Sequence, residues 1–250
     1  MIQNFTSKWP IFAPIEIDFD QGRLRDEIVL SNILTKSKIA TTQQVDGKNF
    51  WDDQKHFKDH IFEKQKEVPL WNDKELTPST IDTFYQVNVT TFDEDDLADV
   101  WRGEHKTKTR IPLWIAEDYQ WHYRSDYHLP YLESIVNSIG LNYVSMIRII
   151  VQDPPSIGLI HKDSGIKTNS EYYDGGGINI TLNVTTGGAN LYFIDTDDNE
   201  RHVDEDNIKA WHFNDGALHC TSEVSSQRIQ IRIYGNHPNY KSIMDLNRAI

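Results

Sequence analysis

The pattern of hydrophobic positions changes near residue 140 of this 250-residue chain. Before that point, apolar residues recur at helical spacing in two stretches, 23–34 and 126–140, and the segments between them are mixed in composition. The second stretch predicts the more regular helix, with an apolar face made of Leu129, Leu132, Ile135, Val136 and Ile139. Asp126 is its expected N-cap and Gly140 its expected end.

After residue 140, apolar and polar residues alternate, and short runs are separated by clusters of Pro, Gly, Asn and Asp. Alternation with period two is typical of strands that bury one face. The expected strands are residues 141–151, 158–163, 178–184, 189–195, 208–213 and 227–234. Many short strands with tight turns and no intervening helices predict an antiparallel sandwich or barrel.

We expect one domain over residues 1–250, because the length suits a single large core. Residues 1–140 would form a mixed α/β elaboration with supporting helices, and residues 141–237 the barrel that carries the site. Residues 238–250 would form a C-terminal tail or short helix.

The net charge of -13 disfavours nucleic acid as a partner, because an acidic surface repels a polyanion. The longest apolar runs, such as 147–151, fall far short of a membrane span, and the first residues do not resemble a secretory signal. Cys220 is the only cysteine, which excludes an internal disulfide and a cysteine-rich zinc site. These features favour a cytoplasmic protein. The oligomeric state cannot be read from them.

Two residues of the expected strand 158–163, His161 and Asp163, are candidate metal ligands. Residues two apart on a strand point to the same side, so both side chains can face one ion. The tripeptide alone specifies little, because His202 and Asp204 repeat it within an acidic stretch that reads as an exposed loop. The simpler, structural interpretation is a turn in which Asp163 caps backbone amides.

His219 is the candidate third ligand, although a buried, hydrogen-bonded histidine is the simpler interpretation and His212 lies nearby. Two histidines and one carboxylate on one face of a divalent ion leave positions open for other ligands. That arrangement suits iron(II).

The strand 227–234 places Arg228, Gln230, Arg232 and Tyr234 on one face and three isoleucines on the other. The isoleucines are expected to pack beneath the helices. The two arginines would then point into the barrel, where an anion would be needed to compensate them. Arginine is well suited to a bidentate grip on a carboxylate.

His161-x-Asp163, His219 and Arg228 nine residues later resemble the pattern of the iron(II)/2-oxoglutarate oxygenases. More narrowly, Pro154-Pro155, Phe213 and His237-Pro238 resemble the aspartyl/asparaginyl β-hydroxylase family, which includes bacterial amino-acid hydroxylases. The resemblance covers roughly residues 145 to 240. It implies a mainly β fold with flanking helices around a double-stranded β-helix core, the jelly roll of cupins.

The resemblance also implies Fe(II) held by His161, Asp163 and His219, with 2-oxoglutarate as co-substrate bound by Arg228. No catalytic residue beyond the metal ligands is implied. The sequence departs from the family where an Arg-x-His pair is usual, because Asn179 and Thr181 stand there. Asn179 and Thr181 are therefore candidate co-substrate residues, and Arg232 or Arg148 is a candidate replacement for the missing arginine.

The implied reaction is hydroxylation of an unactivated C–H bond with O2, with release of succinate and CO2. The expected substrate is a small molecule or a peptide, most simply an amino acid or an amino-acid side chain. Two alternatives stay open. One is a cupin-type metal enzyme without redox chemistry, and the other is a binding protein that keeps the barrel without catalysis.

Overall fold

The structure is a computed structural model of the whole chain. It describes residues 12–36, 38–41, 83–91, 122–123, 127–154, 156, 158, 177–194, 200–214 and 219–237. His161, Asp163 and Asp126 lie outside the described residues, as do all but the first residue of the expected strand 158–163 and the expected tail 238–250. The division into a support region, a barrel and a tail therefore stays a prediction.

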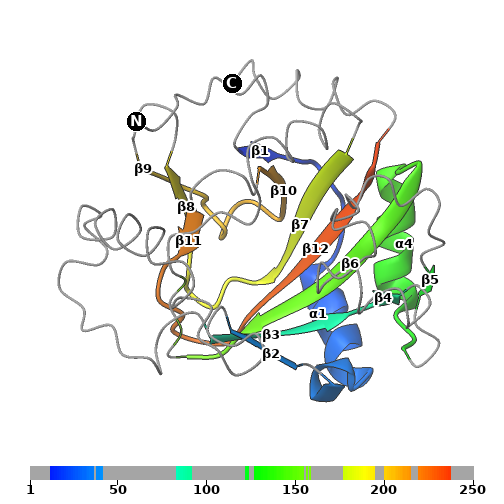
Figure 1. Cartoon of the computed structure of the whole chain (residues 1–250), viewed down its shortest axis with the longest axis horizontal. Helices are drawn as coiled ribbons and strands as arrows, with labels where there is room; N and C mark the ends of the chain where they lie inside the picture. Colours follow the sequence, from blue (N-terminus) through cyan, green and yellow to red (C-terminus); the bar gives the residue numbers. More distant parts are fainter. Residues whose placement is uncertain are drawn as a thin grey trace, which may run out of the picture.

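Both expected helices are present with shifted ends (Figure 1). Helix α1 spans Gln21–Leu30 and is followed by a 3-10 turn, η1, at Ile33–Lys36. Helix α4 spans Pro130–Ile139 and ends at Gly140, which adopts the left-handed conformation with φ 77°. That conformation favours glycine at a helix end, as the sequence predicted.

The strands of the N-terminal half are β1 (Phe12–Pro14), β2 (Lys38–Thr41), β3 (Thr83–Asn88), β4 (Thr90–Thr91) and β5 (His122–Tyr123). Those of the C-terminal half are β6 (Tyr143–Gln152), β7 (Gly177–Thr185), β8 (Leu191–Ile194), β9 (Glu200–His202), β10 (Ala210–Phe213), β11 (His219–Thr221) and β12 (Arg228–Asn236). The alternating pattern predicted β6, β7, β8, β10 and β12. It missed the three-residue strands β9 and β11, which are too short to show a period.

The described strands after residue 140 form two antiparallel sheets between which the chain alternates (Figure 1). The larger sheet has the order β1-β10-β7-β12-β6-β3-β2, and the smaller one β11-β8-β9. The chain leaves β6 and reaches β11 at Gly158, whose N–H donates to the Thr221 carbonyl at 3.0 Å. It then forms β7 in the larger sheet, followed by β8 and β9 in the smaller sheet. After β10 in the larger sheet and β11 in the smaller one, it ends with β12 in the larger sheet. This is the double-stranded β-helix that the sequence predicted, with β1, β2 and β3 added to one sheet.

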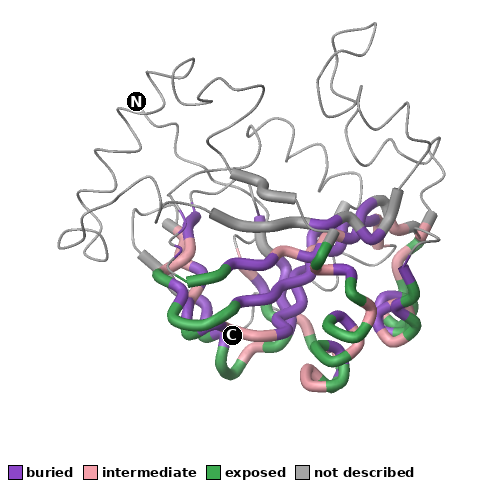
Figure 2. The backbone as a smooth tube through the Cα atoms, turned by 90° about the horizontal axis from the view of Figure 1, so that it is seen from below, coloured by how far each residue is buried: buried purple, intermediate pink, exposed green. Residues whose placement is uncertain are grey.

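The main core lies between the larger sheet and the two helices. On β12, Ile229, Ile231 and Ile233 are no more than 2% exposed, as the alternation predicted. They belong to one cluster with Leu24, Ile28, Leu132, Ile135 and Val136 of the helices. Figure 2 shows the buried stretches along the strands and exposed stretches along the helices and turns. This apolar layer fixes the outer face of the sheet and leaves its inner face for the space between the sheets.

A smaller apolar cluster fills part of that inner space. Trp211 of β10 packs with Leu191 of β8 and Val203, and Phe12 and Phe193 stack beside them with ring centroids 6.0 Å apart. The cluster joins the two sheets, because its residues come from both.

The start of α4 is capped from α1, and the predicted N-cap Asp126 was wrong. Leu129 occupies the N-cap position without a side-chain hydrogen bond. The Glu27 carboxylate of α1 instead accepts from the N–H groups of Tyr131 and Leu132, at 2.7 and 2.9 Å. Helix N-termini attract negative charge. The cap comes from a distant helix, so spacing near residue 126 could not reveal it.

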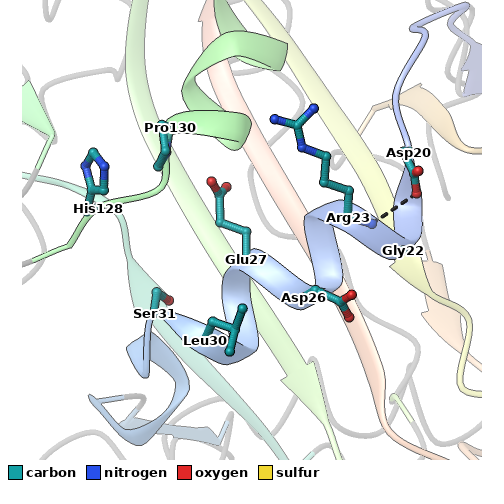
Figure 3. A pocket seen from close by; sticks show the side chains of 9 residues that line it. All are labelled: Asp20, Gly22, Arg23, Asp26, Glu27, Leu30, Ser31, His128 and Pro130. Carbon is teal, nitrogen blue, oxygen red and sulfur yellow. Dashed lines mark hydrogen bonds between the residues drawn. The ribbon is translucent and has the colours of Figure 1, made fainter.

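Figure 3 shows the groove between α1 and the start of α4. Its charged side chains already serve the helices. Asp20 accepts from the N–H of Arg23 at 3.0 Å and caps α1, and the Arg23 guanidinium lies 3.9 Å from the Tyr131 ring centroid. The groove is therefore part of the contact between α1 and α4. None of the helices that the structure describes is long and apolar enough to cross a membrane.

Replacing Glu27 with alanine is expected to lower the free energy of unfolding by about 2 kcal/mol, because two backbone donors of α4 lose their acceptor. The matched control is Asp26→Ala, which removes only an exposed ion pair with Arg25 and should cost less than about 1 kcal/mol. Urea denaturation measures both. Equal effects of the two changes would show that Glu27 does not cap α4.

Candidate active site

The inner face of the larger sheet carries a row of buried polar side chains. Six polar side chains on it are 4% exposed or less, namely Gln152, Asn179, Thr181, Asn183, Arg228 and Gln230. They come from β6, β7 and β12, and each alternates with residues of the apolar layer. Buried polar groups cost free energy unless they are hydrogen-bonded, so their partners define what this face can do.

Arg228 and Glu205 form an ion pair inside the barrel. The side chains are 3% and 0% exposed. The Arg228 Nη2 donates to Glu205 Oε1 at 2.6 Å, and its Nε donates to Oε2 at 3.3 Å. The geometry is bidentate, which is the strong form of this contact. The anion that the sequence required opposite Arg228 is thus supplied by the chain itself.

Two glutamines complete the network around this pair. Arg228 Nη1 donates to Gln152 Oε1 at 2.6 Å, and Gln230 Nε2 donates to Glu205 Oε2 at 3.2 Å. Gln152 in turn donates to the Thr221 hydroxyl on β11 at 3.3 Å. The network therefore joins the larger sheet to the smaller one at the end where β6 stops and β12 begins.

Sequence reasoning missed Glu205. The acidic stretch around it was expected to be an exposed loop, yet Val203 and Glu205 are 1% exposed. Its neighbours Asp204 and Asp206 are exposed, as expected. Nothing in the charge pattern distinguishes the buried acid from the exposed ones. The only available signal was the unbalanced arginine on β12, which implied that some acid or anion had to face it.

His219 is the first residue of β11, opposite Phe193 of β8, and is 2% exposed. Two residues further along β11, Thr221 contacts Gly158. A Cβ on Gly158 would lie 2.8 Å from the Thr221 nitrogen, so the close approach requires glycine. The described residues hold no group of three His, Cys, Asp or Glu side chains around one point. Imidazole is a donor that suits divalent iron, so His219 fits the expected metal.

The four residues expected to bind the co-substrate share the inner face of the larger sheet. Asn179 and Thr181 of β7 lie directly opposite Tyr234 and Arg232 of β12, and Arg228 lies further along β12. Arg232 is half-buried, whereas Asn179 and Thr181 are buried. A face with arginine and hydroxyl donors fits a carboxylate-bearing co-substrate chemically.

His212 and His202, the two alternatives to the predicted ligands, are placed apart from this face. His212 lies opposite Ile180 of β7 and so faces the apolar layer, with its Nδ1 3.0 Å from the Asn179 carbonyl oxygen. Burial lowers its pKa from 6.5 to about 4, against the opposing effect of that hydrogen bond. His202 belongs to β9 at the outer edge of the smaller sheet, and Asp204 accepts from Asn207 in the following turn.

No protein-family model matches the sequence, and no curated protein matches it. Several solved structures match. A Pseudomonas putida prolyl-4-hydroxylase has 10% identity and a TM-score of 0.34, with 87% of this chain and 99% of that chain covered. An oxidoreductase of the 2OG-Fe(II) oxygenase family from Burkholderia pseudomallei has 9% identity and a TM-score of 0.39, covering 89% and 95%. Likenesses of this size assign no function, so the function rests on the residues of the barrel.

Arg228→Met is expected to lower the free energy of unfolding by about 3–5 kcal/mol, because it leaves the Glu205 carboxylate buried and unpaired. The double variant Arg228→Met/Glu205→Met should recover at least half of that loss, since no buried charge remains. Urea denaturation of the wild type and both variants measures the difference. A double variant as unstable as the single one would contradict this explanation, because removing the unpaired carboxylate would then recover no stability.

The unfolding free energy should also fall as the pH falls from 6.5 toward 4, because unfolding lets His212 bind a proton that the folded state refuses. With a folded pKa of about 4, this group alone accounts for a loss of about 3 kcal/mol over that interval. The stabilisation is complete above pH 6.5. His212→Asn keeps a donor for the Asn179 carbonyl. It should reduce the slope of the unfolding free energy against pH by the amount that corresponds to about one proton. Urea denaturation between pH 7 and pH 4.5 tests this, and equal slopes would refute it.

Proposed function

We propose that this protein is an iron(II)- and 2-oxoglutarate-dependent dioxygenase that hydroxylates an unactivated C–H bond. The overall reaction would convert the substrate, 2-oxoglutarate and O2 into the hydroxylated product, succinate and CO2. Bound iron(II) with 2-oxoglutarate would supply the oxidant, and the chain's own residues would hold the reactants and exclude water.

The observation that carries the proposal is the contact between Gly158 and Thr221. It places Gly158 beside β11, which begins at His219. His161 follows Gly158 by three residues and His219 precedes Thr221 by two. Three residues of chain span at most about 11 Å, so both histidines lie within a few residues of one hydrogen bond. This supports a metal site made of His161, Asp163 and His219.

The inner face of β7 and β12 supports the co-substrate half of the proposal. Thr181 and Asn179 offer polar groups there, and Arg228 and Arg232 are the two cations of β12 that could bind the distal carboxylate. The apolar cluster around Trp211 lies between residues of the two sheets and would help to keep water from the reacting centre.

For the substrate, we propose an amino acid or an amino-acid side chain in a peptide. This part of the proposal rests on the resemblance of residues 145 to 240 to the aspartyl/asparaginyl β-hydroxylase family. The expected cytoplasmic location is compatible with either a free or a peptide-bound substrate.

The test is an anaerobic titration of the metal-free protein with iron(II) and then 2-oxoglutarate, followed by visible absorption. The wild type should develop the weak charge-transfer band of an iron-bound 2-oxo acid, because 2-oxoglutarate would chelate the iron through its 2-oxo acid end. His161→Ala should abolish the band, since it removes one of three proposed ligands. His202→Ala is the matched control, because it alters the second His-x-Asp segment, and it should keep the band.

A folded wild type that binds iron(II) without the band would contradict the oxygenase and favour a cupin-type metal enzyme. A folded wild type that binds no metal would favour a binding protein. Loss of the band in His202→Ala with retention in His161→Ala would place the metal at the other segment.

A further inference from the structure

Strand β11, which begins at His219, has few backbone contacts of its own. It is three residues long, and among the described strands it pairs with β8 alone. His219 lies opposite Phe193 and Thr221 opposite Leu191, and both partners pack in the apolar cluster between the sheets. Opposite residues of antiparallel strands share one face, so the His219 side chain faces that space. A strand this short depends on contacts outside its own pairing to keep one position.

Thr221 is held at two points outside the pairing with β8. Its carbonyl accepts from the Gly158 N–H at 3.0 Å, and its hydroxyl accepts from Gln152 Nε2 at 3.3 Å. Gln152 ends β6 in the larger sheet, so the second contact crosses from one sheet to the other. Because Thr221 stands two residues after His219, these contacts fix the strand close to the histidine.

The direction of the Gln152 amide is set by the internal ion pair. Arg228 Nη1 donates to Gln152 Oε1 at 2.6 Å, and a guanidinium has no acceptor atom. The Oε1 must therefore face Arg228, which leaves Nε2, a donor, for the Thr221 hydroxyl. Arg228 is held in turn by its bidentate contact with Glu205. Gln152 is 4% exposed, so water competes little for either bond.

Gln230 offers a comparison within the same network. It is also 4% exposed and lies on the same inner face of the larger sheet. Its Nε2 donates to Glu205 Oε2 at 3.2 Å, and it makes no side-chain hydrogen bond to β11 in the part of the chain that the structure describes. Of the two glutamines around the ion pair, Gln152 is therefore the one that connects it to the smaller sheet.

We infer that Gln152 is a positioning residue for His219. Its amide links the buried ion pair to Thr221, and β11 carries that fixed position to the imidazole two residues away. A metal ligand needs such support, because metal affinity depends on how closely each donor atom is held to its place. The inference rests on the proposed function in one respect, namely that His219 binds the metal. Gln152 itself touches neither metal nor substrate in this arrangement.

The test is a titration of the metal-free, full-length protein with cobalt(II), in the absence of 2-oxoglutarate. Cobalt(II) accepts the same kinds of ligand as iron(II), and its visible spectrum changes with the number and arrangement of those ligands. Gln152→Met and Thr221→Val each remove one partner of the contact and should weaken cobalt(II) binding by about 10- to 100-fold. Combining them should add little to either effect, because both remove the same contact.

Two variants are matched controls. Thr221→Ser keeps the hydroxyl, and Gln230→Met removes a glutamine of the same network that does not reach β11. Both should keep the cobalt(II) affinity and spectrum of the wild type. A general loss of stability would affect Gln230→Met and Gln152→Met alike, whereas loss of positioning changes the spectrum of Gln152→Met alone. Wild-type affinity in Gln152→Met and Thr221→Val would overturn the inference, as would cobalt(II) binding that His219→Ala does not weaken.

Amide hydrogen exchange of the metal-free protein tests the positioning without any metal. The Gly158 N–H and the amides of β11 should exchange faster in Gln152→Met and Thr221→Val than in the wild type, whereas Gln230→Met should leave their rates unchanged. Unchanged rates in Gln152→Met would overturn the inference. If the wild type binds no cobalt(II) while these rates still depend on Gln152, the proposed metal site fails and the positioning of His219 by Gln152 stands.

Discussion

The ion pair between Arg228 and Glu205 is the contact on which the interior of this barrel depends. Glu205 comes from the turn between β9 and β10, Arg228 begins β12, and Gln152 ends β6, so one guanidinium joins three parts of the chain. Gly187, with φ +61°, permits this arrangement, because a Cβ there would lie 2.7 Å from the Cβ of Arg228. Such a pair contributes little net stability over an apolar packing. It connects the end of β6 and the start of β12 to the turn that precedes β10.

The two faces of β12 have different roles, because one packs in the core and the other carries polar side chains. Ile229, Ile231 and Ile233 contribute to the apolar layer under α1 and α4, which supplies the hydrophobic free energy of this half of the molecule. Arg228, Gln230 and Arg232 carry the polar face between those isoleucines. Because the outer face is fully committed to packing, the inner face can hold charged groups that would otherwise prevent a core from forming.

The sequence predicted five strands after residue 140, the two helices and the two faces of β12, because these follow from local spacing. It did not predict the strands of the N-terminal half, among them the six-residue β3. It could not predict contacts made by residues distant in the chain. Glu27 caps a helix more than a hundred residues away, and Glu205 meets an arginine from another strand. Both acids lie among other charged residues, and only the fold distinguishes them. The proposed metal triad would depend on such a distant contact too, since Gly158 reaches Thr221 from another part of the chain.

Arg228 and Arg232 lie on the same face of β12, and Arg228 already has an acidic partner there. At about 3.3 Å per residue, the arginines are about 13 Å apart along the strand. An incoming carboxylate at Arg228 would have to displace Glu205, which already makes a bidentate contact with that cation.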